Sequence, residues 1–180
     1  TPCLVVDLDI IAQNYRDLER ALPRVDIFYA VKANPAKEVL TTLLSLGAFF
    51  DSASIYEIET CLDIGASPDR IAYGNTIKKA QDIAKAFDHG VELFAFDSRA
   101  ELAKLKTEAP GASVFCRIFM DGAGADWPLS RKFGCDPDLA VELMCRAADD
   151  GLKPAGISFH VGSQQRDLAQ WDVAIERAAM

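Results

Sequence analysis

The feature of this sequence that most constrains its fold is a regular alternation of short apolar runs with segments of helical periodicity. Apolar runs that predict strands occupy residues 3–6, 27–32, 48–51, 70–75, 91–97, 113–118 and 155–159. Amphipathic segments that predict helices fill most of the intervals between them. Strands that alternate with helices form parallel sheets through right-handed crossovers. The sequence therefore predicts an α/β fold.

Glycines and capping residues mark the ends of the expected helices. Capping-box pairs begin two of them, Ser54 with Glu57 and Ser98 with Glu101. Glycines that suit a left-handed C-terminal cap follow four of the helical patterns, at Gly47, Gly65, Gly90 and Gly151. These local signals support the same alternation of strands and helices.

Polar side chains stand at the carboxyl end of each expected strand from the second onward: Lys32, Asp51, Asn75, Asp97, Arg117 and His160. Parallel strands bring these ends to one edge of a sheet, so we expect the side chains to converge. About six such βα units are too few to close eight strands, so the sequence predicts an incomplete (β/α)8 TIM-type barrel. A doubly wound open sheet is the alternative, but no G-x-G-x-x-G follows the first strand. The glycines of the loop 121–128 are interpreted as loop flexibility.

Composition excludes several classes of function. The chain carries a formal net charge of -8 and has no basic patch interleaved with aromatic residues, so we expect no nucleic-acid partner. Two histidines and five cysteines without a C-x-x-C pair leave no metal site. The scattered cysteines suggest a reducing compartment, and no signal peptide or apolar run of transmembrane length is found. The sequence predicts a cytoplasmic protein without a membrane partner.

The ends of the chain suggest a piece of a longer protein. The sequence starts at Thr1 rather than a methionine. It stops at Met180 inside an amphipathic stretch, with no cap or breaker after it. No linker divides the chain. We therefore expect residues 1–180 to form one N-terminal barrel domain that lacks its last strands.

Lys32 follows an apolar, β-rich run and precedes Asn34 and Pro35, where a strand cannot continue. Lysine is rarely buried without a partner or a chemical role. Desolvation at such a place would lower the pKa of the amine and make it a nucleophile toward carbonyls, including the aldehyde of pyridoxal phosphate. The alternative is a lysine at a strand end that extends into solvent. The residue alone leaves both interpretations open.

Three charged residues near the expected strand ends are further candidates, each with a structural alternative. Asp51 could pair with a cation or polarise a cofactor, or it could cap the following helix. Glu57 also completes the capping box with Ser54. Arg117 lies in an apolar run and therefore needs an anionic partner, which could be a core carboxylate or a ligand.

The segment 158–164 contains the second strong cluster. His160 leaves an apolar strand and could place a flat ring beside a ligand, while Gly162 and Ser163 could hold a phosphate. The alternative is a histidine with a purely structural role. The other histidine, His89, falls at an expected helix C-terminus, where a cation is favourable.

Taken together, these segments resemble the barrel domain of the fold-type III pyridoxal-phosphate decarboxylases, the ornithine/lysine/diaminopimelate family. Matching segments occur in order over essentially the whole chain: Y-A-V-K-A-N at 29–34, F-D-S-A-S-I-Y-E-I at 50–58, Y-G-N-T-I-K at 73–78, F-D-S at 96–98, L-S-R-K-F-G at 129–134 and S-F-H-V-G-S at 158–163. The segments 53–58 and 129–134 look more like ornithine-type than diaminopimelate-type enzymes. Ser52 replaces the usual cysteine, and Gly74 stands where alanine is common.

The resemblance implies a cofactor and a role for each candidate. Lys32 and His160 would be the catalytic residues: Lys32 would bind pyridoxal 5'-phosphate as a Schiff base, and His160 would stack on its ring. Ser163 would contact the phosphate. Three further side chains would line the site: Asp51, Glu57 and Arg117. The implied activity is decarboxylation of a basic diamino acid, ornithine to putrescine or lysine to cadaverine, in polyamine biosynthesis.

The resemblance also implies that other parts of the site lie outside these residues. In the family, the carboxylate partner of the cofactor ring and a Gly-rich phosphate loop come from later barrel strands, and substrate-binding residues come from a β-domain across a dimer interface. Lys132 would lie near the partner subunit, so we expect a homodimer of the full-length protein and an inactive fragment. A diaminopimelate decarboxylase, a racemase-like or cofactor-carrier barrel, and a non-catalytic decarboxylase-like regulator are the alternatives.

Overall fold

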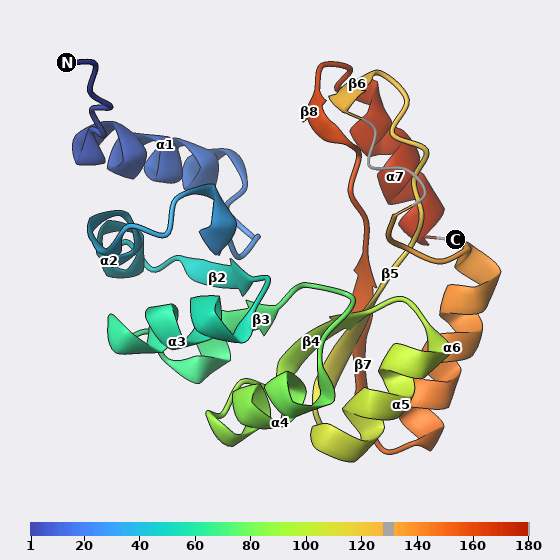
Figure 1. Cartoon of the computed structure of the whole chain (residues 1–180). Coiled ribbons are helices and arrows are strands. Elements are labelled where there is room, and N and C mark those ends of the chain that lie inside the picture. The colour runs from blue at the N-terminus through green and yellow to red at the C-terminus, as the bar shows by residue number, and fades with distance from the viewer. Residues whose placement is uncertain (128–131, 180) are drawn as a thin grey trace.

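The computed structural model describes residues 1–127 and 132–179 and contains one large parallel sheet with helices beside it (Figure 1). Six strands form this sheet in the order β1 (Phe28–Ala30), β2 (Phe49–Ser52), β3 (Ile71–Tyr73), β4 (Leu93–Phe96), β5 (Ser113–Arg117) and β7 (Lys153–Ser158). Every neighbouring pair is parallel. Strands that follow one another without reversal build a barrel wall, whereas a doubly wound sheet reverses its order at a switch point. The predicted incomplete barrel is confirmed.

Helices accompany the large sheet, and those from α2 to α6 connect its strands. They are α1 (Leu8–Ala21), α2 (Lys37–Ser45), α3 (Ile55–Asp63), α4 (Ala80–Asp88), α5 (Arg99–Glu108), α6 (Pro137–Asp149) and α7 (Ala169–Ala179). Two short 3-10 turns, η1 (Val31–Ala33) and η2 (Pro68–Arg70), accompany them. In Figure 1, the helices α2 to α6 follow the outer side of the curved sheet. This arrangement leaves the carboxyl ends of the strands free to build a site.

The hydrophobic core lies between the sheet and these outer helices. Large side chains with no more than 1% exposure fill it from both sides, among them Phe50, Phe94, Phe96, Leu105 and Leu143. Burying each such side chain contributes on the order of 1.5–3 kcal/mol, so the core holds the strand ends in fixed positions.

The predicted helix caps are confirmed. Ser54 Oγ accepts the N–H of Glu57 at 3.3 Å, and Ser98 Oγ accepts the N–H of Glu101 at 3.2 Å. Positive φ angles, between 82° and 93°, occur at the four predicted capping glycines, Gly47, Gly65, Gly90 and Gly151. Each cap therefore forms where the local sequence placed it.

Two strand predictions are wrong at the N-terminal side of the sheet. Residues 3–6 form no strand among the described residues, and Leu4 and Val5 are 89% and 81% exposed. An apolar run becomes a strand only where a neighbour satisfies its backbone, and this segment has none in the described structure. The run 27–32 forms a strand only over Phe28–Ala30 and then turns into η1, because Pro35 holds Asn34 extended and the chain must change direction before it.

The loop predicted at 121–128 contains a strand that the sequence did not indicate. β6 (Ala125–Trp127) pairs antiparallel with β8 (Ser163–Gln165) in a separate two-stranded sheet. Gly162 makes this approach feasible, because a Cβ at that residue would overlap the Cβ of Ala125. Residues 129–131 of the predicted L-S-R-K-F-G motif lie outside the described residues, whereas 132–134 lie within them.

Candidate functional site

A cavity of about 710 Å³ opens at the carboxyl ends of the parallel strands. Five of the six polar strand-end residues expected to converge line it together: Lys32, Asp51, Asn75, Arg117 and His160. Small, apolar and aromatic residues and one serine complete the wall: Phe28, Ala53, Ala72, Gly74, Leu93, Phe115, Phe133, Ile157, Ser158 and Phe159. The volume suits a small-molecule ligand. The predicted convergence at one edge of the sheet is confirmed.

Lys32 lies in η1, directly after β1, and its side chain faces this cavity. Of the two interpretations that the sequence left open, the described structure shows the lysine that extends into solvent, because the residue is exposed. In this chain β1 is an edge strand of the six-stranded sheet. The amine therefore belongs to the cavity, but it is open to solvent there.

Asp51 lies in β2, and the sheet register places it between Ala30 of β1 and Ala72 of β3. Burial raises the pKa of its carboxyl group, and the positive charge of Lys32 opposes that rise. The helix-cap alternative is excluded because α3 is capped by Ser54. Asp51 is thus a half-buried carboxylate of the cavity wall.

Glu57 stands behind this wall rather than in it. Its Oε2 accepts the N–H of Ala53 at 2.7 Å, and its own N–H binds Ser54. Both polar ends of the residue therefore hold the turn that leads into α3. Its negative charge reaches Asp51, where it helps to raise the pKa. A direct contact of Glu57 with the cofactor stays a prediction.

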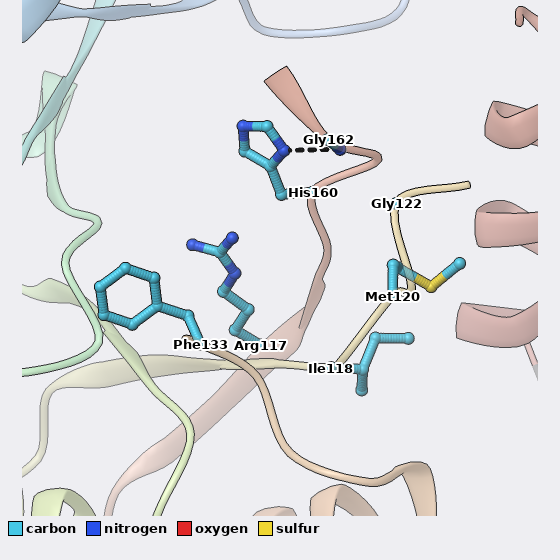
Figure 2. A pocket seen from close by; sticks show the side chains of 7 residues that line it. All are labelled: Arg117, Ile118, Met120, Gly122, Phe133, His160 and Gly162. Atoms are coloured by element: carbon cyan, nitrogen blue, oxygen red, sulfur yellow. Dashed lines mark hydrogen bonds between the residues drawn. The ribbon is translucent and has the colours of Figure 1, made fainter. Parts of the chain in front are cut away.

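Arg117 is the last residue of β5, and its side chain points between the rings of Phe133 and His160 (Figure 2). Its guanidinium carbon lies 5.3 Å from the centre of the Phe133 ring, a cation–π arrangement. Burial lowers the pKa of the guanidinium group, and the charges of Asp97 and Asp51 oppose this. No carboxylate of the described residues lies within ion-pair distance of Arg117. This arrangement favours a ligand contact over a core ion pair.

The segment around Gly134 brings Phe133 onto Arg117. Gly134 has a φ of 93°, and a Cβ on it would lie 2.7 Å from the backbone of Ile118. Its N–H donates to Oδ2 of Asp97 at 2.8 Å. Only glycine combines this conformation with such a close approach. The glycine of the K-F-G motif is therefore required by the structure, and Asp97 accepts the hydrogen bond that holds it.

His160 follows β7, and its ring orientation is set by its own loop (Figure 2). Its Nδ1 accepts the N–H of Gly162 at 2.9 Å, which leaves Nε2 to carry the proton of the neutral ring. Burial lowers the pKa of the imidazole, and the charges of Arg117 and Lys32 lower it further. The ring is therefore neutral at pH 7. The hollow beside it has only about 10 Å³, room for about one water molecule.

Ser163 begins β8 and is not part of the wall of the large cavity. Its backbone pairs with that of Trp127 in the small antiparallel sheet. The structure thus places it next to the His160 loop, one residue beyond Gly162. Its contact with a phosphate stays a prediction.

Asn75 lies in the cavity wall, as its position at a strand end predicted, although the sequence gave it no catalytic role. Its side-chain amide donates to the carbonyl of Ala53 at 3.3 Å, and its own carbonyl accepts from Lys78 Nζ at 2.9 Å. Lys78 is completely buried and forms an ion pair with Glu101 at 2.9 Å. In the sequence, the asparagine and the lysine of the matched segment 73–78 were the signal that could have indicated these contacts. Phe133 and Phe159 were missed because apolar wall residues look like core residues in a sequence.

The sequence predicted neither a metal site nor a membrane-spanning segment, and the described residues can be examined for both. Within residues 1–127 and 132–179, histidine, cysteine and acidic side chains form no group that could hold a metal ion. Among the same residues, no helix combines the length and the apolar character that a membrane crossing requires.

The comparisons with known proteins identify the family. Residues 8–180 match the family described as "Pyridoxal-dependent decarboxylase, pyridoxal binding domain". The chain belongs to this family. It is 40% identical to the lysine/ornithine decarboxylase of Selenomonas ruminantium over 97% of its own length and 44% of that enzyme. The crystal structure of lysine decarboxylase from the same organism superposes with a TM-score of 0.92, at 40% identity, over 99% of this chain and 47% of the other.

A further relative belongs to a different functional class. Antizyme inhibitor 2 of Xenopus laevis is 38% identical over 98% of this chain and 39% of its own length. The chain spans less than half the length of each of these relatives. The family match confirms the predicted fold class and the predicted cofactor, pyridoxal phosphate.

The residues of the cavity fit that cofactor. A primary amine at Lys32 suits its aldehyde, the neutral ring of His160 suits stacking on a pyridine ring, and the cation of Arg117 suits an anionic group. The cavity volume is large enough for a ligand of this class.

Proposed function

We propose that the protein containing this chain decarboxylates a basic diamino acid, ornithine to putrescine or lysine to cadaverine, with pyridoxal phosphate as cofactor. The observation that carries the proposal is the convergence of Lys32, Asp51, Arg117 and His160 on one cavity in a pyridoxal-binding domain. The names of the relatives point to ornithine and lysine as substrates. Polyamine biosynthesis is the corresponding process.

In such a site, the side chains would bind and orient the cofactor and carry protons. When bound, pyridoxal phosphate supplies the electron sink that makes loss of CO2 from an amino acid feasible. Lys32 would hold the cofactor through its amine, and the same amine, when free, could carry a proton. The neutral ring of His160 would help to orient the cofactor. The carboxylate of Asp51 keeps a negative charge close to the amine of Lys32.

The rest of the site belongs to segments outside these residues in our proposal. Residues 1–180 would form the N-terminal part of the barrel, which agrees with the chain covering about 44% of the lysine/ornithine decarboxylase. We further propose that the full-length protein is a homodimer and cytoplasmic. The five cysteines are all free thiols, which supports a reducing compartment.

The test uses the full-length protein loaded with pyridoxal phosphate. Borohydride reduction followed by peptide mass spectrometry should locate the cofactor on Lys32, and Lys32→Ala should abolish the visible absorbance. Lys37→Ala is the matched control, because Lys37 is an exposed lysine at the start of α2 and is not part of the cavity wall. Covalent attachment that survives in Lys32→Ala would refute the assignment of the anchor.

The activity is tested separately from cofactor binding. Ornithine, lysine, arginine and diaminopimelate are offered to the full-length protein, and CO2 and the product amine are measured. Release of CO2 from ornithine or lysine supports the proposal. A protein that binds the cofactor and releases CO2 from diaminopimelate alone would be the diaminopimelate enzyme. Absence of turnover with every substrate would favour the regulator class, to which antizyme inhibitor 2 belongs by name.

A further inference from the structure

Two of the five cysteines lie in direct contact close to the cavity wall. Cys116 belongs to β5, and Cys135 directly follows the K-F-G segment. Their Sγ atoms are 3.6 Å apart, although the residues are 19 positions apart in the sequence. Both are free thiols and both are buried, Cys116 completely and Cys135 to 7% exposure. The proposed function gives neither thiol a role.

Each cysteine is close in sequence to a residue of the cavity wall. Cys116 directly precedes Arg117, and Cys135 lies two positions after Phe133. The two segments are also joined through their backbones, because the N–H of Cys135 donates to the carbonyl of Arg117 at 3.0 Å. A change in the distance between the two sulfurs is therefore transmitted directly to the contact between Arg117 and the Phe133 ring.

Hydrogen bonding makes the two thiols chemically different. The S–H of Cys135 donates to the carbonyl of Arg117 at 3.6 Å, so the Cys135 sulfur accepts the S–H of Cys116. This contact lowers the pKa of Cys135, and the same contact together with burial raises the pKa of Cys116. The thiolate is the form of cysteine that reacts with oxidants. Cys135, which is also the less buried of the two, is therefore the thiol that reacts first.

We propose that Cys116 and Cys135 are a redox modification site, which closes to a disulfide in the presence of a peroxide and thereby weakens cofactor binding. The Cys135 thiolate attacks one oxygen of hydrogen peroxide and becomes a sulfenic acid, and the departing hydroxide takes up the proton that Cys135 lost. The Cys116 sulfur then displaces the hydroxyl group of the sulfenic acid, which leaves with the Cys116 proton as a second water. One peroxide is reduced, two thiols are oxidised, and a thiol reductant reverses the cross-link by exchange.

Closing the disulfide should disturb the cavity wall. The S–S bond is about 2.05 Å long, so the sulfurs must approach by about 1.5 Å. Cys116 is held in place, because β5 pairs with β4 on one side and with β7 on the other. The movement therefore falls on the segment 133–135, and it shifts the Phe133 ring relative to Arg117. The effect on the cofactor rests on the proposed function, in which Arg117 contacts its anionic group.

The test treats the full-length protein with hydrogen peroxide, blocks the remaining thiols and maps its peptides by mass spectrometry without reduction. A peptide pair that joins Cys116 to Cys135 should appear and should vanish after treatment with dithiothreitol. The dissociation constant for pyridoxal phosphate, followed by visible absorbance, should rise about fivefold or more on oxidation and recover on reduction. By reciprocity, saturating cofactor should shift the equilibrium in a glutathione redox buffer toward the two thiols by the same factor.

Single substitutions provide the controls. Cys116→Ala and Cys135→Ala should each abolish the cross-link and the effect of peroxide on cofactor affinity. Cys61→Ala is the matched control and should keep both, because Cys61 is equally buried but its thiol lies next to Ser52 rather than another cysteine.

Three results would overturn the proposal: no cross-link in the parent protein, a cross-link that leaves the cofactor affinity unchanged, or an unchanged peroxide effect in the two alanine variants. A variant that does not fold leaves the decision to the mapping and the affinity of the parent protein. If the parent binds no cofactor, the proposed function fails, while the mapping still decides whether Cys116 and Cys135 are a redox site.

Discussion

Replacing Lys78 with methionine should destabilise the protein strongly, although the residue does not line the cavity. Its ammonium is completely buried, and Glu101 is only 3% exposed. Nζ donates to the carbonyls of Asn75 and Ala95 at 2.9 Å and 2.5 Å and pairs with Glu101 at 2.9 Å. Methionine fills a similar volume but satisfies none of these three acceptors.

The structure sets the size of the effect. Removing one partner of a buried ion pair costs about 3–5 kcal/mol, because the other charge stays buried. Lys104 still contacts the second carboxylate oxygen of Glu101 at 2.6 Å, and it is about one-third exposed, so part of the charge remains compensated. We therefore expect Lys78→Met to lower the free energy of unfolding by about 3 kcal/mol, toward the lower end of that range.

Urea denaturation of the full-length protein at pH 7 measures this change. Lys85→Met is the matched control, because Lys85 pairs with Glu59 at the surface and should shift the midpoint very little. The double variant Lys78→Met with Glu101→Leu should recover much of the loss, because it removes both charges. A midpoint for Lys78→Met that equals that of Lys85→Met would refute the reasoning.

Three further predictions concern the site. Burial raises the pKa of Asp51, so the cofactor-free fold should lose stability as pH rises from the ordinary value of 3.8 through the raised one; Asp51→Asn should flatten this dependence in urea titrations at several pH values. Gly134→Ala should cost more than about 1 kcal/mol of unfolding free energy, since it clashes with the Ile118 backbone; an unchanged urea midpoint would contradict this. By NMR, His160 should titrate below 6.5, and a midpoint above that value would contradict its burial.

Much of the fold could be predicted because its signals are local. Capping boxes and glycines after helical patterns act within one turn of chain, and the observed caps at Ser54 and Ser98 lie where the sequence placed them. The side chains that line the cavity could be predicted for a related reason. Parallel strands have their carboxyl ends at one edge, so the order of the strands brings Asp51, Arg117 and His160 together.

The wrong predictions concern properties that depend on distant neighbours. Residues 3–6 are apolar enough for a strand but have no strand partner in the described structure. β6 and β8 pair across a long interval of sequence, which no local pattern indicates.

The sequence by itself determined the alternation of strands and helices, the helix ends and the identity of the residues at the strand ends, because each is encoded by neighbours along the chain. Only the tertiary structure decided which of those residues share a cavity, how their pKa values shift and which groups they contact. Burial lowers the pKa of His160, and the β2–β3 register brings the carboxylate of Asp51 against Gly74. Burial and steric contact are set by groups far apart in sequence, so they exist only once the sheet has formed.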